Sequence, residues 1–171
     1  MNKKKLCFGL CIIGITLLYI FWNSLQPVVQ SNEQSRRVLE VIEEVFNTPP
    51  LDTEEAQHIV RKAAHVAEFA LLGMEMVLLL FVARKMSRGN LTTVLFIGLI
   101  SAVTDETIQV FSQRGSQVLD VWIDFAGLMM GIGIGAAAHA LVRSVRRYVR
   151  KQKHTAIKNM HIYQYGNEQS S

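Results

Sequence analysis

Three short stretches of the chain carry side chains that can do chemistry, and in each the polar residues recur at helical spacing. They are Lys62, His65 and Glu68; Asp105 and Gln109; and Asp120 and Asp124. Residues three or four positions apart share one face of a helix. A histidine beside a carboxylate offers general acid–base chemistry near neutral pH. Lysine and arginine bind phosphate, and grouped carboxylates bind divalent cations such as Mg²⁺.

These charged stretches lie in a chain that is otherwise strongly apolar. Half of its 171 residues are hydrophobic, and its net charge is +4. Residues 6–32, 91–104 and 125–142 contain no Asp, Glu, Lys or Arg. A soluble domain would distribute its charges to keep each helix amphipathic. Uncharged runs that alternate with basic clusters indicate a polytopic membrane protein, and they do not fit a disordered chain, a disulfide scaffold or a nucleic-acid-binding protein.

The apolar runs predict an all-α helical bundle with four transmembrane helices. About 20 apolar residues cross a bilayer, so we expect spans at about residues 6–25, 59–83, 91–111 and 118–142. In the polar segment 26–58, apolar residues between Val38 and Phe46 predict a short amphipathic helix. Asp52 or Thr53 is expected to cap the second span. We predict a transmembrane domain over residues 1–143 and a basic, flexible cytoplasmic tail over 144–171.

The basic residues predict the orientation. They gather at Lys3–Lys5, between Arg84 and Arg88, and from Arg143 to Lys153, whereas the segment between the first two spans is acidic. With four spans, all three basic segments fall on one side, which the positive-inside rule makes cytoplasmic. We therefore expect a multi-pass protein of the bacterial plasma membrane, with both termini in the cytoplasm.

Depth along the helices predicts that the polar groups meet. At 1.5 Å per residue, Glu68 lies about 9 Å below Lys62, Asp105 about 21 Å above the start of its span, and Asp124 about 6 Å below Asp120. All of them then lie in the outer leaflet. A charged residue at the centre of a span costs roughly 2.5–3.5 kcal/mol, so these groups are expected to face each other, water or a ligand.

Four motifs of the chain resemble the VanZ-like family of bacterial membrane proteins. The resemblance covers about residues 20–135 and is carried by Ser24-x-Gln26-Pro27, Arg61-Lys62-x-x-His65-x-x-Glu68-Phe69-x-x-Leu72-Gly73, Asp105-Glu106-x-x-Gln109-x-Phe111-x-x-x-Arg114, and Asp120-x-x-x-Asp124-x-x-Gly127-x-x-x-Gly131. The glycines of the last motif predict close helix packing. The resemblance implies an integral membrane protein whose founding relative is linked to resistance against teicoplanin-type glycopeptides, and it implies no settled reaction.

Residues and resemblance together define a candidate site. The expected ligand-binding residues are Lys62, His65, Glu68, Asp105, Glu106, Gln109, Arg114, Asp120 and Asp124. His65, Glu68 and Asp105 are the candidates for acid–base catalysis, although whether any reaction occurs is left open. Asp105, Asp120 and Asp124 are the candidates for binding a cation such as Mg²⁺.

Three interpretations of this site stay open. The site can bind a phosphate-bearing membrane lipid, a lipid-linked cell-wall precursor or a lipoglycopeptide antibiotic. Alternatively, the charges can simply hold three helices together, without a ligand. In the third interpretation Glu75, Glu68 and His65 form a proton relay or transport path along the second span.

Overall fold

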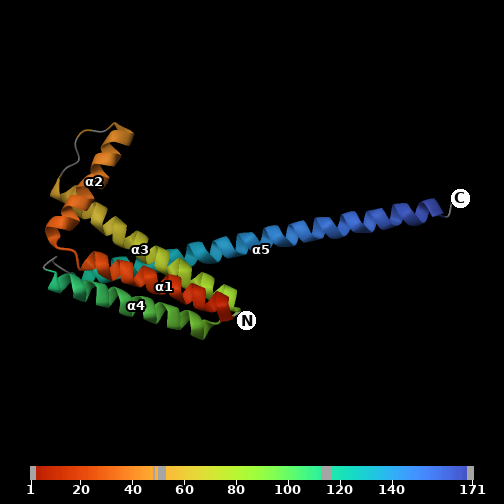
Figure 1. Cartoon of the computed structure of the whole chain (residues 1–171), viewed down its shortest axis with the longest axis horizontal. Helices are drawn as coiled ribbons and strands as arrows, with labels where there is room; N and C mark the ends of the chain where they lie inside the picture. Colours follow the sequence, from red (N-terminus) through yellow and green to blue (C-terminus); the bar gives the residue numbers. More distant parts are fainter. Residues whose placement is uncertain (1–2, 48, 50–52, 113–116, 169–171) are drawn as a thin grey trace. The chain divides into compact units, whose positions relative to one another are not determined.

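The computed structural model of the chain describes residues 3–47, 49, 53–112 and 117–168, with side chains described up to residue 152. These residues contain five helices and no strand (Figure 1). The helices are α1 (Lys3–Ser24), α2 (Val28–Phe46), α3 (Glu54–Ala83), α4 (Arg88–Phe111) and α5 (Val118–Glu168). The predicted all-α fold is therefore confirmed.

Four of the helices are long and apolar enough to cross a membrane. They are α1, α3, α4 and the part of α5 from Val118 to Gln152. Large apolar side chains on their outer surfaces, among them Phe8, Trp22, Phe96 and Trp122, are more than half exposed. Such surfaces suit contact with lipid, and the predicted four-span arrangement is confirmed at this level.

The second span begins earlier than the apolar run alone predicts. The Thr53 hydroxyl accepts a hydrogen bond from the backbone N–H of Ala56 at 3.1 Å, so α3 starts at Glu54, as the expected cap predicts, ahead of the apolar run that begins near residue 59. Glu54 and Glu55 follow in the first turn, where the helix dipole favours negative charge. Of the two expected caps, Thr53 is confirmed and Asp52 lies outside the described residues.

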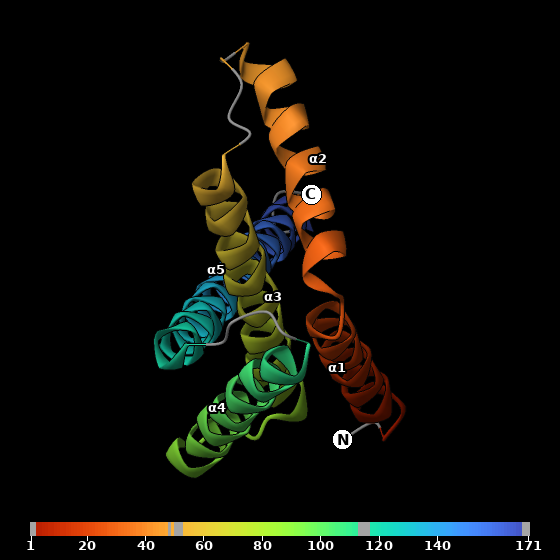
Figure 2. The same ribbon diagram turned by 90° about the vertical axis from the view of Figure 1, so that its left-hand side faces the viewer.

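The predicted amphipathic helix is α2, and it lies alongside the N-terminal half of α3 (Figure 2). It begins after Pro27 and ends at Asn47, whose left-handed backbone (φ 50°) terminates the helix. Its buried side chains are Ser31, Ser35 and Leu39, and its apolar Val41 and Val45 remain exposed.

The contacts divide the chain into two units, residues 1–136 and 137–171. The first unit contains α1 to α4 and the beginning of α5. The second unit consists of the rest of α5, which stays helical to Glu168. The predicted boundary after residue 143 and the flexibility of the tail stay predictions.

The core of the first unit lies where α1, α3, α4 and α5 meet. Ile20, Phe69, Leu72, Ala102 and Leu128 are fully buried there.

The helices α3 and α5 approach each other through glycine. A Cβ atom at Gly131 would lie 1.8 Å from the carbonyl oxygen of Ala70, and one at Gly73 would lie 2.2 Å from that of Leu128. Only glycine allows two helix backbones to come this close. The close packing that the sequence predicts at the glycine motif is therefore present, and it places the polar N-terminal parts of α3 and α5 next to each other.

Candidate functional site

Polar side chains from α1, α3, α4 and α5 gather at the end of the bundle where α1 and α4 finish and α3 and α5 begin. We call them the polar cluster: Asn23, Ser24, Lys62, His65, Glu68, Asp105, Glu106, Gln109, Asp120 and Asp124. Each helix contributes its polar residues from the last or first turns of an apolar span. The sequence predicted this convergence for α3, α4 and α5.

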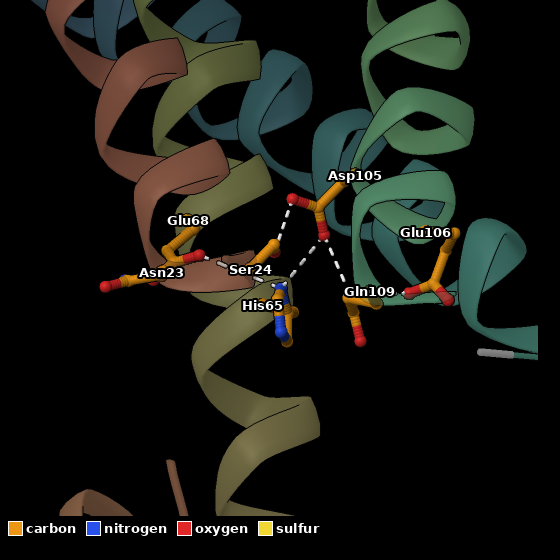
Figure 3. Close-up of polar contacts among 7 residues, drawn as sticks. All are labelled: Asn23, Ser24, His65, Glu68, Asp105, Glu106 and Gln109. Carbon is orange, nitrogen blue, oxygen red and sulfur yellow. Dashed lines mark hydrogen bonds and ion pairs between the residues drawn. The ribbon is translucent and has the colours of Figure 1, made fainter. Parts of the chain in front are cut away.

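Asp105 on α4 lies at the centre of the polar cluster and is fully buried (Figure 3). Its Oδ1 atom accepts a hydrogen bond of 2.6 Å from the Ser24 hydroxyl, and its Oδ2 atom accepts one of 2.9 Å from the Gln109 amide. The same Gln109 nitrogen lies 2.9 Å from Glu106 Oε1. Such bonds to a charged acceptor are strong and fix the direction of the carboxylate.

His65 on α3 faces two carboxylates. Its Nδ1 atom lies 3.5 Å from Asp105 Oδ2 and 3.8 Å from Glu68 Oε2. Both separations exceed the 2.7–3.2 Å usual for an N–H···O hydrogen bond. Glu68 is held from the other side by Asn23 of α1, whose amide donates a bond of 2.6 Å to Glu68 Oε1 (Figure 3).

Two acidic residues of α5 belong to the polar cluster, and their surroundings differ. Asp120 pairs with Lys62 of α3, with 2.6 Å between Oδ1 and Nζ. Asp124 lies one turn further along α5 and is only 2% exposed. Its carboxylate, that of Asp105 and the imidazole of His65 each offer one donor atom, and these atoms lie within 4.8 Å of one another. Among the described residues, these three offer metal-binding atoms that converge. The predicted cation set of Asp105, Asp120 and Asp124 stays a prediction.

Two hollows open onto the polar cluster. A small one, of about 50 Å³, lies between α3, α4 and α5 and is bordered by His65, Glu106, Asp120 and Asp124. A larger one, of about 280 Å³, lies between α1, α2 and α3, with Asn23, His65 and Glu68 among its lining residues. Arg61 lines both. The arrangement can therefore accept a small ion on one side of α3 and a polar group of several atoms on the other.

A comparison with protein-family profiles shows the family to which the chain belongs. The VanZ/LLP1 family profile matches residues 8–139, which is most of the chain and includes every residue of the polar cluster. The chain belongs to the VanZ/LLP1 family. Comparisons with curated proteins and with solved structures give no significant match. Membership makes this a VanZ-type membrane protein, and the resemblance inferred from its motifs is confirmed.

Within this VanZ/LLP1 chain, eight of the nine predicted ligand-binding residues belong to the polar cluster. Arg114, the ninth, lies outside the described residues. Asn23, Ser24 and Arg61 were not among the predicted ligand-binding residues, although Arg61 was one of the bases expected to neutralise the carboxylates. The signal for Ser24 was its position in the first family motif, and the signal for Arg61 was its place directly before Lys62.

Glu75 lies apart from these contacts, further along α3. It accepts a hydrogen bond of 3.0 Å from the Thr16 hydroxyl of α1. It lines a different, mainly apolar cavity of about 610 Å³ with Phe8, Ile12 and Leu79. The path from Glu75 through Glu68 to His65, which a proton relay requires, stays a prediction.

Proposed function

We propose that this VanZ-type protein binds the phosphate of a lipid at Arg61, on the extracytoplasmic side of the plasma membrane, and thereby alters susceptibility to teicoplanin-type glycopeptides. The observation that carries the proposal is the position of Arg61. Its side chain lines the small and the larger hollow of the polar cluster, and also a third hollow of about 430 Å³ between α2 and α3.

Arg61 is suited to an anionic group. Its guanidinium donates a hydrogen bond to the Asn32 side chain of α2, which fixes one edge of the guanidinium. The planar guanidinium carries five donors, so others remain for phosphate oxygens. The lysine that follows it is already engaged, because Lys62 lies 2.6 Å from Asp120.

The larger hollow has the size and lining of a head-group site. Its volume of about 280 Å³ is at the lower end for small-molecule pockets, so it suits a head group whose chains stay in the bilayer. Hydroxyl and amide groups of Tyr19, Asn23, Gln34 and Ser35 border it. Both an ordinary phospholipid and a lipid-linked cell-wall precursor carry the phosphate that this chemistry recognises.

The charge distribution supports the extracytoplasmic side. The basic residues Lys3–Lys5 and Arg84–Arg88 belong to the opposite ends of α1, α3 and α4 from the polar cluster. The positive-inside rule assigns those ends to the cytoplasm.

Binding is proposed in preference to a reaction. Arg61 borders several hollows at once, whereas His65 Nδ1 lies 3.5 Å and 3.8 Å from the carboxylates that would orient it as a general base, longer than a usual N–H···O hydrogen bond. The catalytic roles of His65, Glu68 and Asp105 stay predictions.

Native mass spectrometry of the full-length protein tests the proposal. The purified protein is mixed with phosphatidylglycerol, with a polyprenyl phosphate, or with diacylglycerol, which has no phosphate. We expect adducts with one or both phosphate lipids and none with diacylglycerol. An arginine–phosphate interaction of about 1.5–3 kcal/mol predicts that Arg61→Gln weakens binding by about 10- to 100-fold.

Arg36→Gln is the matched control. Arg36 is an exposed arginine of α2 that pairs with Glu40 at 3.7 Å and is not among the lining residues of these hollows. Binding by this variant should equal that of the wild type. Equal binding of all three lipids, or full retention by Arg61→Gln, would refute the proposal, and the preferred phosphate lipid distinguishes the phospholipid from the cell-wall precursor.

A further inference from the structure

The carboxyl group of Asp124 is buried among other carboxyl groups. Asp124 is 2% exposed, and its Oδ2 atom has no hydrogen-bond partner among the described residues. Four carboxylates lie close enough to repel a negative charge on Asp124: those of Asp105, Glu106, Asp120 and Glu68. Buried charges in proteins are paired or coordinate metals.

The atoms around Asp124 have the chemistry of a metal site. One donor atom each from Asp124, Asp105 and His65 lies within 4.8 Å of the other two. Three helices contribute, α5, α4 and α3. This set differs from a simple acidic patch because it includes an imidazole nitrogen, and because the buried Oδ2 atom of Asp124 has no hydrogen-bond partner among the described residues.

The spacing between His65 and Asp105 supports shared coordination. Their Nδ1 and Oδ2 atoms are 3.5 Å apart, which is long for a hydrogen-bonded ion pair. Two donors that each lie about 2.1 Å from a tetrahedral Zn²⁺ are about 3.4 Å apart. The observed separation therefore matches two ligands of one ion.

The surroundings of the three residues resemble the outer partners of known metal ligands. Asp105 accepts hydrogen bonds from Ser24 and Gln109, and a carboxylate has lone pairs left for a cation after accepting two such bonds. Partners of this kind orient metal ligands and keep them in place.

We propose that His65, Asp105 and Asp124 form a Zn²⁺ site whose fourth position faces the small hollow. That hollow is bordered by His65 and Asp124, and its volume of about 50 Å³ is large enough for a bound water. Zinc with three protein ligands and a water is a common arrangement. Imidazole favours Zn²⁺ over Mg²⁺, which prefers oxygen ligands, so the donor set selects a different ion from the Mg²⁺ that the carboxylates alone suggest.

A metal titration of the full-length protein in detergent, without added lipid, tests the site. The protein is stripped with a chelator, loaded with Zn²⁺ or Mg²⁺, desalted and analysed for metal by mass spectrometry. We expect about one Zn²⁺ per chain and a higher melting temperature with Zn²⁺, and at least tenfold weaker binding of Mg²⁺. His65→Ala and Asp124→Asn should each weaken Zn²⁺ binding by at least tenfold.

Two controls separate this site from adventitious zinc. His139→Ala removes a histidine of the second unit, and Cys7→Ser with Cys11→Ser removes two exposed thiols of α1. Both proteins should retain the stoichiometric Zn²⁺. Loss of Zn²⁺ in either control, or its retention by both site variants, would overturn the proposal, and so would equal affinity for Mg²⁺.

Spectroscopy of the wild type covers the case in which the site variants do not fold. Pulsed electron paramagnetic resonance of the protein loaded with Mn²⁺ should detect one directly bound imidazole nitrogen, and its absence would also overturn the proposal. Because no phosphate lipid is present, the outcome is independent of head-group binding. If the protein binds zinc but no phosphate lipid, only the proposed function is rejected. If it binds a phosphate lipid but no zinc, only the zinc site is rejected.

Discussion

Replacing Gly131 by alanine should separate α3 from α5. A Cβ atom at this position would lie 1.8 Å from the carbonyl oxygen of Ala70 and 2.5 Å from its carbonyl carbon. Carbon atoms in contact are normally about 3.5–4.0 Å apart, so the two helices would have to move apart by more than about 1 Å. The obstacle is backbone, which cannot rotate away as a side chain can. Overpacking of this kind costs about 1–3 kcal/mol.

The expected effect is measurable by thermal denaturation of the full-length protein in detergent. For a chain of this size, about 2 kcal/mol corresponds to a melting temperature lower by about 4–8 °C. Gly133→Ala is the matched control, because no atom lies within 4 Å of a Cβ there. Alanine stabilises an exposed helix position by about 0.5–1 kcal/mol over glycine, so this variant should melt slightly higher than the wild type.

The same pair of variants tests the connection between packing and site. Moving α5 away from α3 carries Asp124 away from His65, so Gly131→Ala should bind Zn²⁺ more weakly than Gly133→Ala. If Gly131→Ala melts at or above the temperature of Gly133→Ala, the close approach of α3 and α5 is not a feature of the folded protein.

Three further predictions concern individual contacts. Ser24→Ala removes the 2.6 Å bond to Asp105 and should lower the free energy of unfolding by about 1.5–3 kcal/mol, as measured by chemical denaturation. An unchanged value would mean that α1 does not hold Asp105. Lys62→Ala leaves the mostly buried Asp120 unpaired and should cost about 1–2 kcal/mol by the same measurement. The double variant Lys62→Met, Asp120→Leu should regain most of that loss, because it removes both charges, and no recovery would contradict pairing as the cause. If the wild type changes teicoplanin susceptibility as proposed, cells that express Arg61→Gln should lose that change in a broth-dilution assay with Arg36→Gln as control. The same susceptibility in the two variants would separate phosphate binding from the phenotype.

The sequence was sufficient to predict the helices and the level along them at which the polar residues meet, because both depend on local properties. Run length and the absence of charge defined the four spans, and Thr53 marked the start of α3. The common depth of His65, Asp105 and Asp124 followed from the rise per residue alone.

The partners within the polar cluster could not be predicted in the same way. They depend on how each helix is rotated about its axis, which is fixed by packing against its neighbours. Asn23 and Ser24 look like ordinary polar residues at the end of a span, yet they bond to Glu68 and Asp105. Lys62 was expected to neutralise one of several acids, and the structure shows that it pairs with Asp120.

The position of α3 among its partners has a consequence for biogenesis. Glu68 bonds to α1, which is synthesised before α3, but His65 and Lys62 face acids of α4 and α5, which are synthesised afterwards. While the ribosome has produced only the first half of the chain, the polar turns of α3 lack two of their three partner helices. Release of α3 from the translocon into lipid should therefore become more favourable once α4 and α5 have emerged. A nascent chain truncated after α3 would expose those charges to the acyl chains and present them to membrane quality-control proteases.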